Sequence, residues 1–117
     1  MNRHSNADVV DDRLKAGDDV NHQEKAGWTA LHFGAQNNDS VIVQKLLGAG
    51  ADHRLLDNHG NTALFRAVFS YDNGPECVSV LLAAGADPDS LNNDGVSPRS
   101  LAHSIGNYDT AKFFPDK

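Results

Sequence analysis

Six histidines, one cysteine and sixteen carboxylates are the side chains with which this chain of 117 residues could do chemistry. A zinc site would need several of these side chains at ligand spacing. His22 and His53 share no such spacing with His4, His59 or His103. The histidine pattern therefore predicts no metal site.

One short cluster of acidic residues and histidines leaves a cation site open as an alternative. Asp52 and His53, followed by Asp57 and His59, could together gather a cation. A solvated turn is the interpretation that we favour for this segment, because residues of these types are common in exposed turns.

A second segment looks like a calcium loop. Ser90, Asn92 and Asp94 alternate before Gly95, as the oxygen ligands of such a loop do. The twelfth position of that loop needs a bidentate glutamate and here holds Leu101. The match fails, and we expect no bound metal.

Catalytic motifs are missing from the sequence. It contains no Walker loop, no Gly-x-Ser-x-Gly and no His-Glu-x-x-His. Cys77 stands at an apolar helix position, which predicts a buried, inert thiol rather than a nucleophile. We expect a protein that is not an enzyme and that needs no cofactor.

Composition narrows the class of partner. The net charge of −6 argues against nucleic acid and against an anionic membrane, because both require a basic face. A single cysteine fits a reducing compartment, and no apolar run approaches the ~20 residues that span a bilayer. The first residues also lack the apolar stretch of a signal peptide. We expect a cytoplasmic chain that is monomeric when free.

The elements that must position these side chains come from an internal repeat. Two segments recur, Gly27–Leu31 at Gly60–Leu64 and Leu46–Asp52 at Leu81–Asp87. The first recurrence has an offset of 33 residues and the second an offset of 35, and a third copy starts at Gly95. The two extra residues fall between the paired segments, most simply within Ser70–Gly74. The chain is therefore a repeat array.

The repeated residues resemble a known family. Thr29-Ala30-Leu31-His32 and Thr62-Ala63-Leu64-Phe65 are similar to the Thr-Pro-Leu-His opening of ankyrin repeats, and Leu-Leu-x-x-Gly-Ala-Asp is similar to their close. The resemblance covers about residues 8–114. It implies an all-α ankyrin-repeat solenoid of helix-turn-helix repeats joined by hairpin-like loops. It also implies that His32 bonds to the backbone of the neighbouring hairpin.

Local signals agree with this fold. Thr29, Thr62 and Ser97 can cap first helices, and apolar spacing predicts second helices over 40–48 and 75–83. A single amphipathic helix over 6–16 and a pair over 98–104 and 108–114 would close the ends. We expect one domain, 1–117, made of an N-terminal half-repeat and about three repeats. The half-repeat is a cap at 1–24, and the repeats lie at 25–56, at 57–91 with the two-residue insertion, and at 92–117 as a C-terminal capping repeat.

In this family, hairpin tips and the exposed side of the first helices line a concave groove that binds other proteins. Carried over residue by residue, the expected contact positions are Lys25, Ala26, Trp28, Gln36, Asn37, Asn58, His59, Asn61, Phe69, Ser70, Tyr71, Asp72, Asn93, Asp94, Val96, Ser104 and Ile105. Trp28, the only tryptophan, is the leading candidate, because tryptophan is enriched among interface hot spots. Packing of Trp28 over the N-terminal cap or over Leu55–Leu56 is the structural alternative.

Three functions stay open. The leading hypothesis is a protein-binding module without enzymatic activity. A narrower form follows from the last repeat, which resembles the ending of small bacterial ankyrin proteins that act as immunity proteins against a cognate secreted toxin. The alternatives are a generic adaptor or scaffold protein, and a fragment of a larger multidomain protein or enzyme.

Overall fold

The computed structural model describes residues 20–70 and 76–104, and within them the chain forms five helices and no strand. The helices are α2 (Ala30–Gln36), α3 (Ser40–Gly48), α4 (Ala63–Phe69), α5 (Glu76–Ala83) and α6 (Pro98–Ser104). The predicted helices over 6–16 and 108–114 lie outside the described residues. Those over 40–48 and 98–104 are confirmed to the residue, and α5 is confirmed from Glu76 onward.

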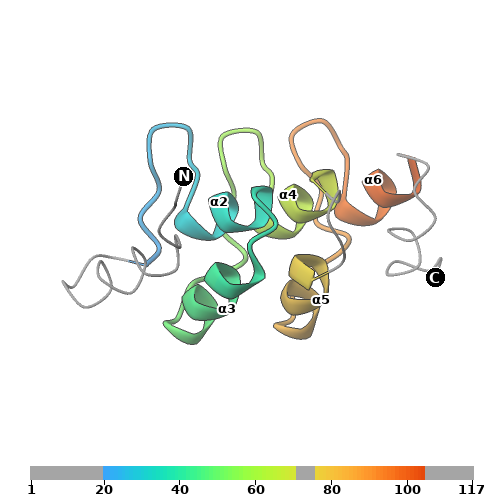
Figure 1. Ribbon diagram of the computed structural model, residues 1–117. Coiled ribbons are helices and arrows are strands. Elements are labelled where there is room, and N and C mark those ends of the chain that lie inside the picture. The colour runs from blue at the N-terminus through green and yellow to red at the C-terminus, as the bar shows by residue number, and fades with distance from the viewer. Residues whose placement is uncertain (1–19, 71–75, 105–117) are drawn as a thin grey trace, which may run out of the picture.

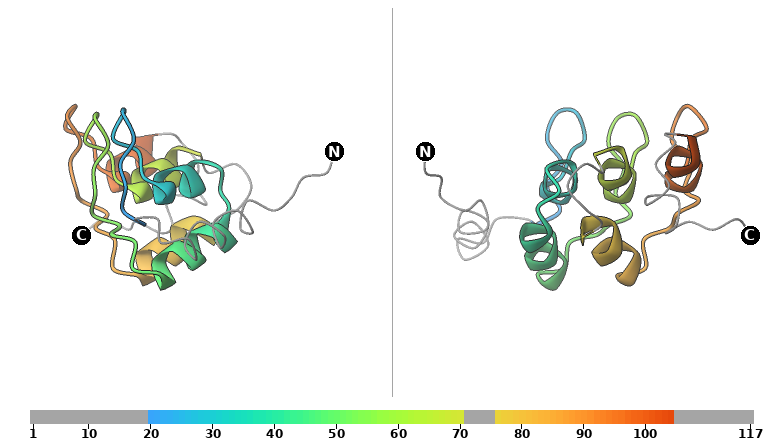
Figure 2. Two further views of the ribbon diagram at one scale, coloured as in Figure 1. Left: turned by 90° about the vertical axis from the view of Figure 1, so that its left-hand side faces the viewer. Right: turned by 45° about the vertical axis from the view of Figure 1, so that its right-hand side comes forward.

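The helices form two rows beneath a row of hairpin loops. Helices α2, α4 and α6 stand side by side as the inner row, directly below the loops, and α3 and α5 form the outer row (Figure 1). Within a repeat, α2 packs on α3 and α4 on α5, whereas α2–α4, α4–α6 and α3–α5 are contacts between repeats. Seen end-on, the three hairpins project to one side of the helices and follow one another closely (Figure 2).

Each first helix begins where its sequence predicts. The Thr29 and Thr62 hydroxyls accept hydrogen bonds from the backbone N–H of His32 and Phe65, and Ser97 does the same for Ser100. These bonds satisfy N–H groups that have no partner inside the helix. The three caps therefore set the same register for each inner helix.

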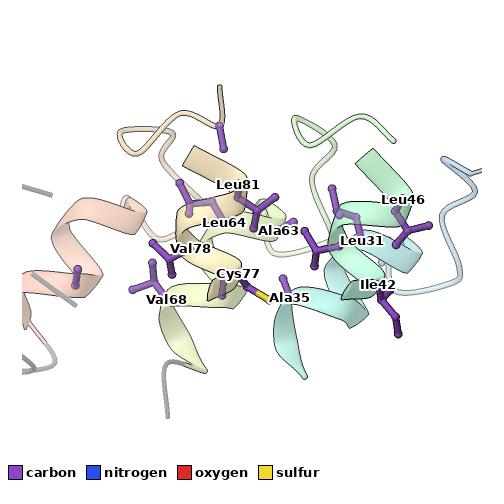
Figure 3. Packing of buried hydrophobic residues seen from close by; sticks show 14 residues of the cluster. Leu31, Ala35, Ile42, Leu46, Ala63, Leu64, Val68, Cys77, Val78 and Leu81 are labelled. Atoms are coloured by element: carbon purple, nitrogen blue, oxygen red, sulfur yellow. The ribbon is translucent and has the colours of Figure 1, made fainter. Parts of the chain in front are cut away.

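The core lies between the two rows. Leu31 and Leu64 of the inner helices and Leu46 and Leu81 of the outer helices are almost completely buried and pack with smaller residues (Figure 3). Cys77 of α5 is one of these residues, as predicted. Since each helix pair buries its apolar faces against the next pair, the repeats are stabilised by their neighbours.

Candidate protein-binding surface

The hairpin loops owe their shape to one side-chain oxygen in each. Glu24, Asp57 and Asn92 stand three residues before the turn glycine of successive repeats, and each oxygen accepts two backbone N–H groups of its own loop. The donors are Ala26 and Trp28 for Glu24, His59 and Asn61 for Asp57, and Asp94 and Val96 for Asn92, at 2.7–3.1 Å. These bonds hold the tips in fixed positions before any partner arrives.

The tips are also tied to one another. The backbone N–H of Asn58 donates to the Ala26 carbonyl at 2.9 Å, and its side-chain amide donates to the Lys25 carbonyl at 3.1 Å. Asn93 repeats both bonds one hairpin later, to His59 and to Asn58, at 2.9 and 3.1 Å. The three tips consequently present one continuous surface.

His32 fastens an inner helix to the next hairpin. Its Nδ1 accepts the Thr29 N–H at 3.1 Å, so the proton is on Nε2, which donates to the Asn61 carbonyl at 2.8 Å. Burial lowers the pKa of His32, more than the Asn61 carbonyl and the Asp57 carboxylate raise it. The imidazole is therefore held neutral, and the role implied by the resemblance is confirmed.

Asn61 was predicted as an exposed contact residue, and the structure buries it. Only 5% of its surface is exposed, because its carbonyl accepts from His32 and its side-chain oxygen accepts from Asn92 Nδ2 at 2.8 Å. Asn61 therefore joins three repeats together and offers little surface to a partner. The prediction failed because it treated each hairpin as an isolated finger.

Trp28 is half-buried in a cluster of its own. Its ring lies 4.7 Å from the ring of Phe33, centroid to centroid, and the Arg66 guanidinium lies 4.5 Å above the Trp28 ring. The N-terminal cap, one of the alternative contacts expected for Trp28, lies for the most part outside the described residues. Trp28 thus supports Phe33 and Arg66.

Arg66 is held in turn by a buried carboxylate. Its Nε and one terminal nitrogen donate to Asp57 Oδ2 at 3.3 and 3.1 Å, and the Asp57 side chain is fully buried. Burial alone would raise the pKa of Asp57, but N–H donors of Asn61 and His59 and the pairing with Arg66 together lower it. The charge stays on Asp57, and the guanidinium stays stacked on Trp28.

Two phenylalanines of the inner row remain exposed. Phe33 of α2 has 47% of its surface exposed and Phe69 of α4 has 58%. Phe69 was predicted as a contact residue, whereas Phe33 was missed. The repeat register contained the signal, because Phe33, Arg66 and Leu101 occupy the same position of successive inner helices.

The other predicted contact residues divide by exposure. Those exposed are Lys25, Ala26, Asn37, Asn58, His59, Asn93, Asp94 and Ser104; those half-buried are Gln36, Ser70 and Val96. Tyr71, Asp72 and Ile105 lie outside the described residues. The exposed ones lie at the hairpin tips and toward the ends of the inner helices, and in the end-on view the hairpins project to one side of those helices (Figure 2).

The cluster kept open as a cation site, Asp52 and His53 with Asp57 and His59, has another arrangement. Asp52 pairs with Arg54 at 3.0 Å, and Asp57 is taken up by Arg66. Among residues 20–70 and 76–104, no three His, Cys, Asp or Glu side chains gather as a metal site. Burial, with the negative charges of Asp39 and Glu76, raises the pKa of Cys77 to about 11, so that its thiol is protonated near neutral pH.

Comparison with known families agrees with the geometry. A family model described as ankyrin repeats, in three copies, matches residues 2–92. The chain belongs to the ankyrin-repeat family. The hairpin row, the two helix rows and the His32 bond are this chain's version of that repeat, and ankyrin repeats are a non-catalytic fold that generally binds other proteins.

Similar ankyrin proteins occur in animals and viruses. The chain is 33% identical to an intracellular phospholipase A2 of Caenorhabditis elegans over 86% of its own length and 10% of that protein. It is 32% identical to the tyrosine-protein kinase HTK16 of Hydra vulgaris, over 83% of this chain and 17% of the kinase. A putative ankyrin repeat protein of fowlpox virus, FPV031, is 30% identical to this chain over 92% of the chain and 33% of the viral protein. The chain spans a third or less of the length of these relatives.

No helix in the described part of the chain is long and apolar enough to cross a membrane.

Proposed function

We propose that this chain is a non-enzymatic module that binds a partner protein on its concave side, with Phe33 and Phe69 as the main apolar contacts. The observation that carries the proposal is the exposure of these two residues, 47% and 58%, on neighbouring inner helices. Large exposed apolar side chains of this kind are typical of interaction sites. Aromatic residues are also enriched where interfaces carry most of their energy.

The surroundings favour binding because they are already ordered. Trp28 supports Phe33, Arg66 supports Trp28, and Asp57 holds Arg66. A partner that meets a surface fixed in this way loses less free energy to ordering side chains. Trp28, the leading candidate from the sequence, is in this proposal the support of the contact surface.

The proposal has narrower forms that differ in which protein is the partner. A generic adaptor and an immunity protein that neutralises a bacterial toxin would use the same surface with different partners. The relatives described above come from eukaryotes and viruses, which favours the adaptor. If the chain is one part of a larger enzyme, the same surface would bind a partner or another part of that enzyme.

The proposal is tested with alanine variants. A partner is captured on the immobilised chain, identified by mass spectrometry and titrated by calorimetry. We expect Phe33→Ala and Phe69→Ala each to cost at least ~2 kcal/mol of binding free energy, the level that defines a hot spot. Melting temperatures should change less than in a core truncation, because both residues are about half exposed.

Val41→Ala is the matched control. Val41 is 52% exposed on the outer helix α3, so its truncation removes apolar surface of a comparable exposed kind from the other side. Affinity that survives both phenylalanine variants but falls in Val41→Ala would place the interface on the outer row and refute the proposal. Co-expression with a candidate toxin would test the immunity form separately.

A further inference from the structure

Five residues of two hairpins and two inner helices form a closed network of contacts. His32 Nε2 donates to the Asn61 carbonyl at 2.8 Å, and the Asn61 N–H donates to Asp57 Oδ1 at 3.0 Å. Asp57 Oδ2 accepts from Arg66 at 3.1 Å, and the Arg66 guanidinium lies 4.5 Å from the centre of the Trp28 ring. The Trp28 ring lies 5.9 Å from the His32 ring, centroid to centroid, which closes the network. A change at one of these residues therefore reaches the others through direct contacts.

His32 is the member of this network whose charge changes in mildly acidic solution. Burial has the largest effect on its pKa and lowers it, and the hydrogen bond to the Asn61 carbonyl raises the pKa by less. Of the two charges that act on the ring, the Asp57 carboxylate raises the pKa and the Arg66 guanidinium lowers it. The charged residues of the first hairpin and of α3 are not among those that shift it: Glu24, Lys25, Asp39 and Lys45. The ring is therefore neutral near pH 7 and takes up its second proton below 6.5.

The Thr29 hydroxyl offers the protonated ring a second arrangement. In the neutral ring, Nδ1 of His32 accepts the Thr29 N–H at 3.1 Å, and a proton on Nδ1 turns that contact into two facing donors. Thr29 Oγ1 lies 2.9 Å from the same nitrogen, and a hydroxyl oxygen can accept from it. The proton can thus be taken up inside the folded chain, at the expense of the Thr29 N–H. Because a buried N–H without an acceptor is costly, we expect the backbone at Thr29 to move.

The residues that would move are chain neighbours of the contact surface. Trp28 directly precedes Thr29, and Phe33 directly follows His32. The rings of Trp28 and Phe33 are in contact, 4.7 Å apart between centroids. With His32 charged, two cations lie against the Trp28 ring, since the Arg66 guanidinium is already stacked on it. Like charges repel each other, so the support of Phe33 is weakened.

We infer that His32 is a proton-operated switch of the concave contact surface: a proton taken up at Nδ1 displaces Thr29 and Trp28 and weakens partner binding while the repeats stay folded. The inference rests on the proposed function and specifies how that surface is regulated. Such a switch needs a group with two arrangements that differ in their contacts. Thr29 is that group, because its N–H donates to the neutral ring and its hydroxyl oxygen is within reach of the charged one.

The test begins on the whole chain without a partner. NMR of the imidazole nitrogens measures at which pH His32 gains its second proton and on which nitrogen. The emission of Trp28, the only tryptophan, is followed over the same range, from pH 8 to about 4.5, and circular dichroism measures whether the helices persist. We expect the NMR and emission titrations to share one midpoint below 6.5, with the circular dichroism unchanged.

His32→Gln removes the proton site, and His59→Gln is the matched control because His59 is exposed at a hairpin tip. Emission of the His32 variant should be independent of pH, whereas the His59 variant should titrate like the unaltered chain. If His32→Gln does not fold, the shared midpoint of the two titrations in the unaltered chain still decides. A flat emission, two midpoints more than about one pH unit apart, or loss of the helices at the same midpoint would overturn the switch.

The affinity of the captured partner is then measured on both sides of this midpoint. We expect its Kd to rise at least fivefold when His32 is charged, and to rise less than twofold in His32→Gln. If the emission titrates but the affinity does not, the regulation is wrong, and the proposed function stands as long as Phe33→Ala and Phe69→Ala weaken binding. If neither phenylalanine variant weakens binding, the proposed function and its regulation both fail.

Discussion

The Nε2 of His32 donates to the carbonyl oxygen of Asn61 at 2.8 Å, so that the first helix of one repeat is bonded to the hairpin of the next. The bond requires a neutral ring, because Nδ1 is occupied as an acceptor of the Thr29 N–H. A second proton would have to break that acceptor bond. Protonation of His32 therefore disfavours the stacking of the first two repeats.

Stability should fall as the pH drops below about 6.5, the ordinary pKa of histidine. Because the folded pKa of His32 is lowered, the unfolded chain binds a proton first, and the stabilisation present above that pH is lost on acidification. Asp57 also has a lowered pKa, so its contribution is complete above the ordinary aspartate pKa of 3.8 and is lost only as the pH falls below that value, outside the range of this measurement. Thermal melts between pH 5 and 8 would measure the effect. His32→Gln should flatten the profile, whereas the same change at exposed His59 should not.

Leu64→Ala should cost about 2–5 kcal/mol, the range for truncating a fully buried leucine. A chain of this length has about 6–17 kcal/mol of stability in total, so the loss is severe. Urea unfolding followed by circular dichroism measures it. Leu56→Ala removes the same atoms from a residue that is 45% exposed and should cost far less. Equal losses would show that the core is not where the helix register puts it.

Gly60→Ala and Gly95→Ala should differ although both glycines have positive φ, 81° and 76°. Either alanine costs about 1–2 kcal/mol for the left-handed backbone. At Gly60 the added Cβ would also lie 2.9 Å from the backbone nitrogen and 2.7 Å from Oδ1 of Asn93, whereas at Gly95 it meets open space. Unfolding midpoints in urea should rank Gly60→Ala below Gly95→Ala. The reverse order would contradict the tight approach of the second and third hairpins.

Arg66→Met should cost about 3 kcal/mol, the lower end for breaking a buried ion pair, because it strands the Asp57 charge while Arg66 itself keeps some exposure. The emission of Trp28 should change at the same time, since the guanidinium leaves its ring. Arg54→Met is the control, because Arg54 pairs with Asp52 in the open. An unchanged melt and an unchanged emission spectrum for Arg66→Met would show that the pair does not support the cluster.

Local signals in the sequence predicted the helices well. The caps Thr29 and Thr62 and the repeated Gly-Ala-Asp segments act within a few residues, so they can be read without knowing the fold. The contact surface was harder to predict from the sequence, because the exposure of a side chain depends on the neighbouring repeat. Asn61 was expected to be exposed but is covered by Asn92, and Phe33, which was not among the expected contact residues, is left exposed by the packing of α2.

The second repeat has Phe65 where the first has His32. A phenyl ring cannot donate a hydrogen bond, so the contact between the second and third hairpins depends instead on the Asn92–Asn61 side-chain bond and the tip bonds of Asn93. The two junctions between the described repeats are therefore held by different bonds. Backbone amides of α6 should exchange with deuterium sooner than those of α2 and α4, and opening of the molecule should begin from the third repeat while the first two stay folded.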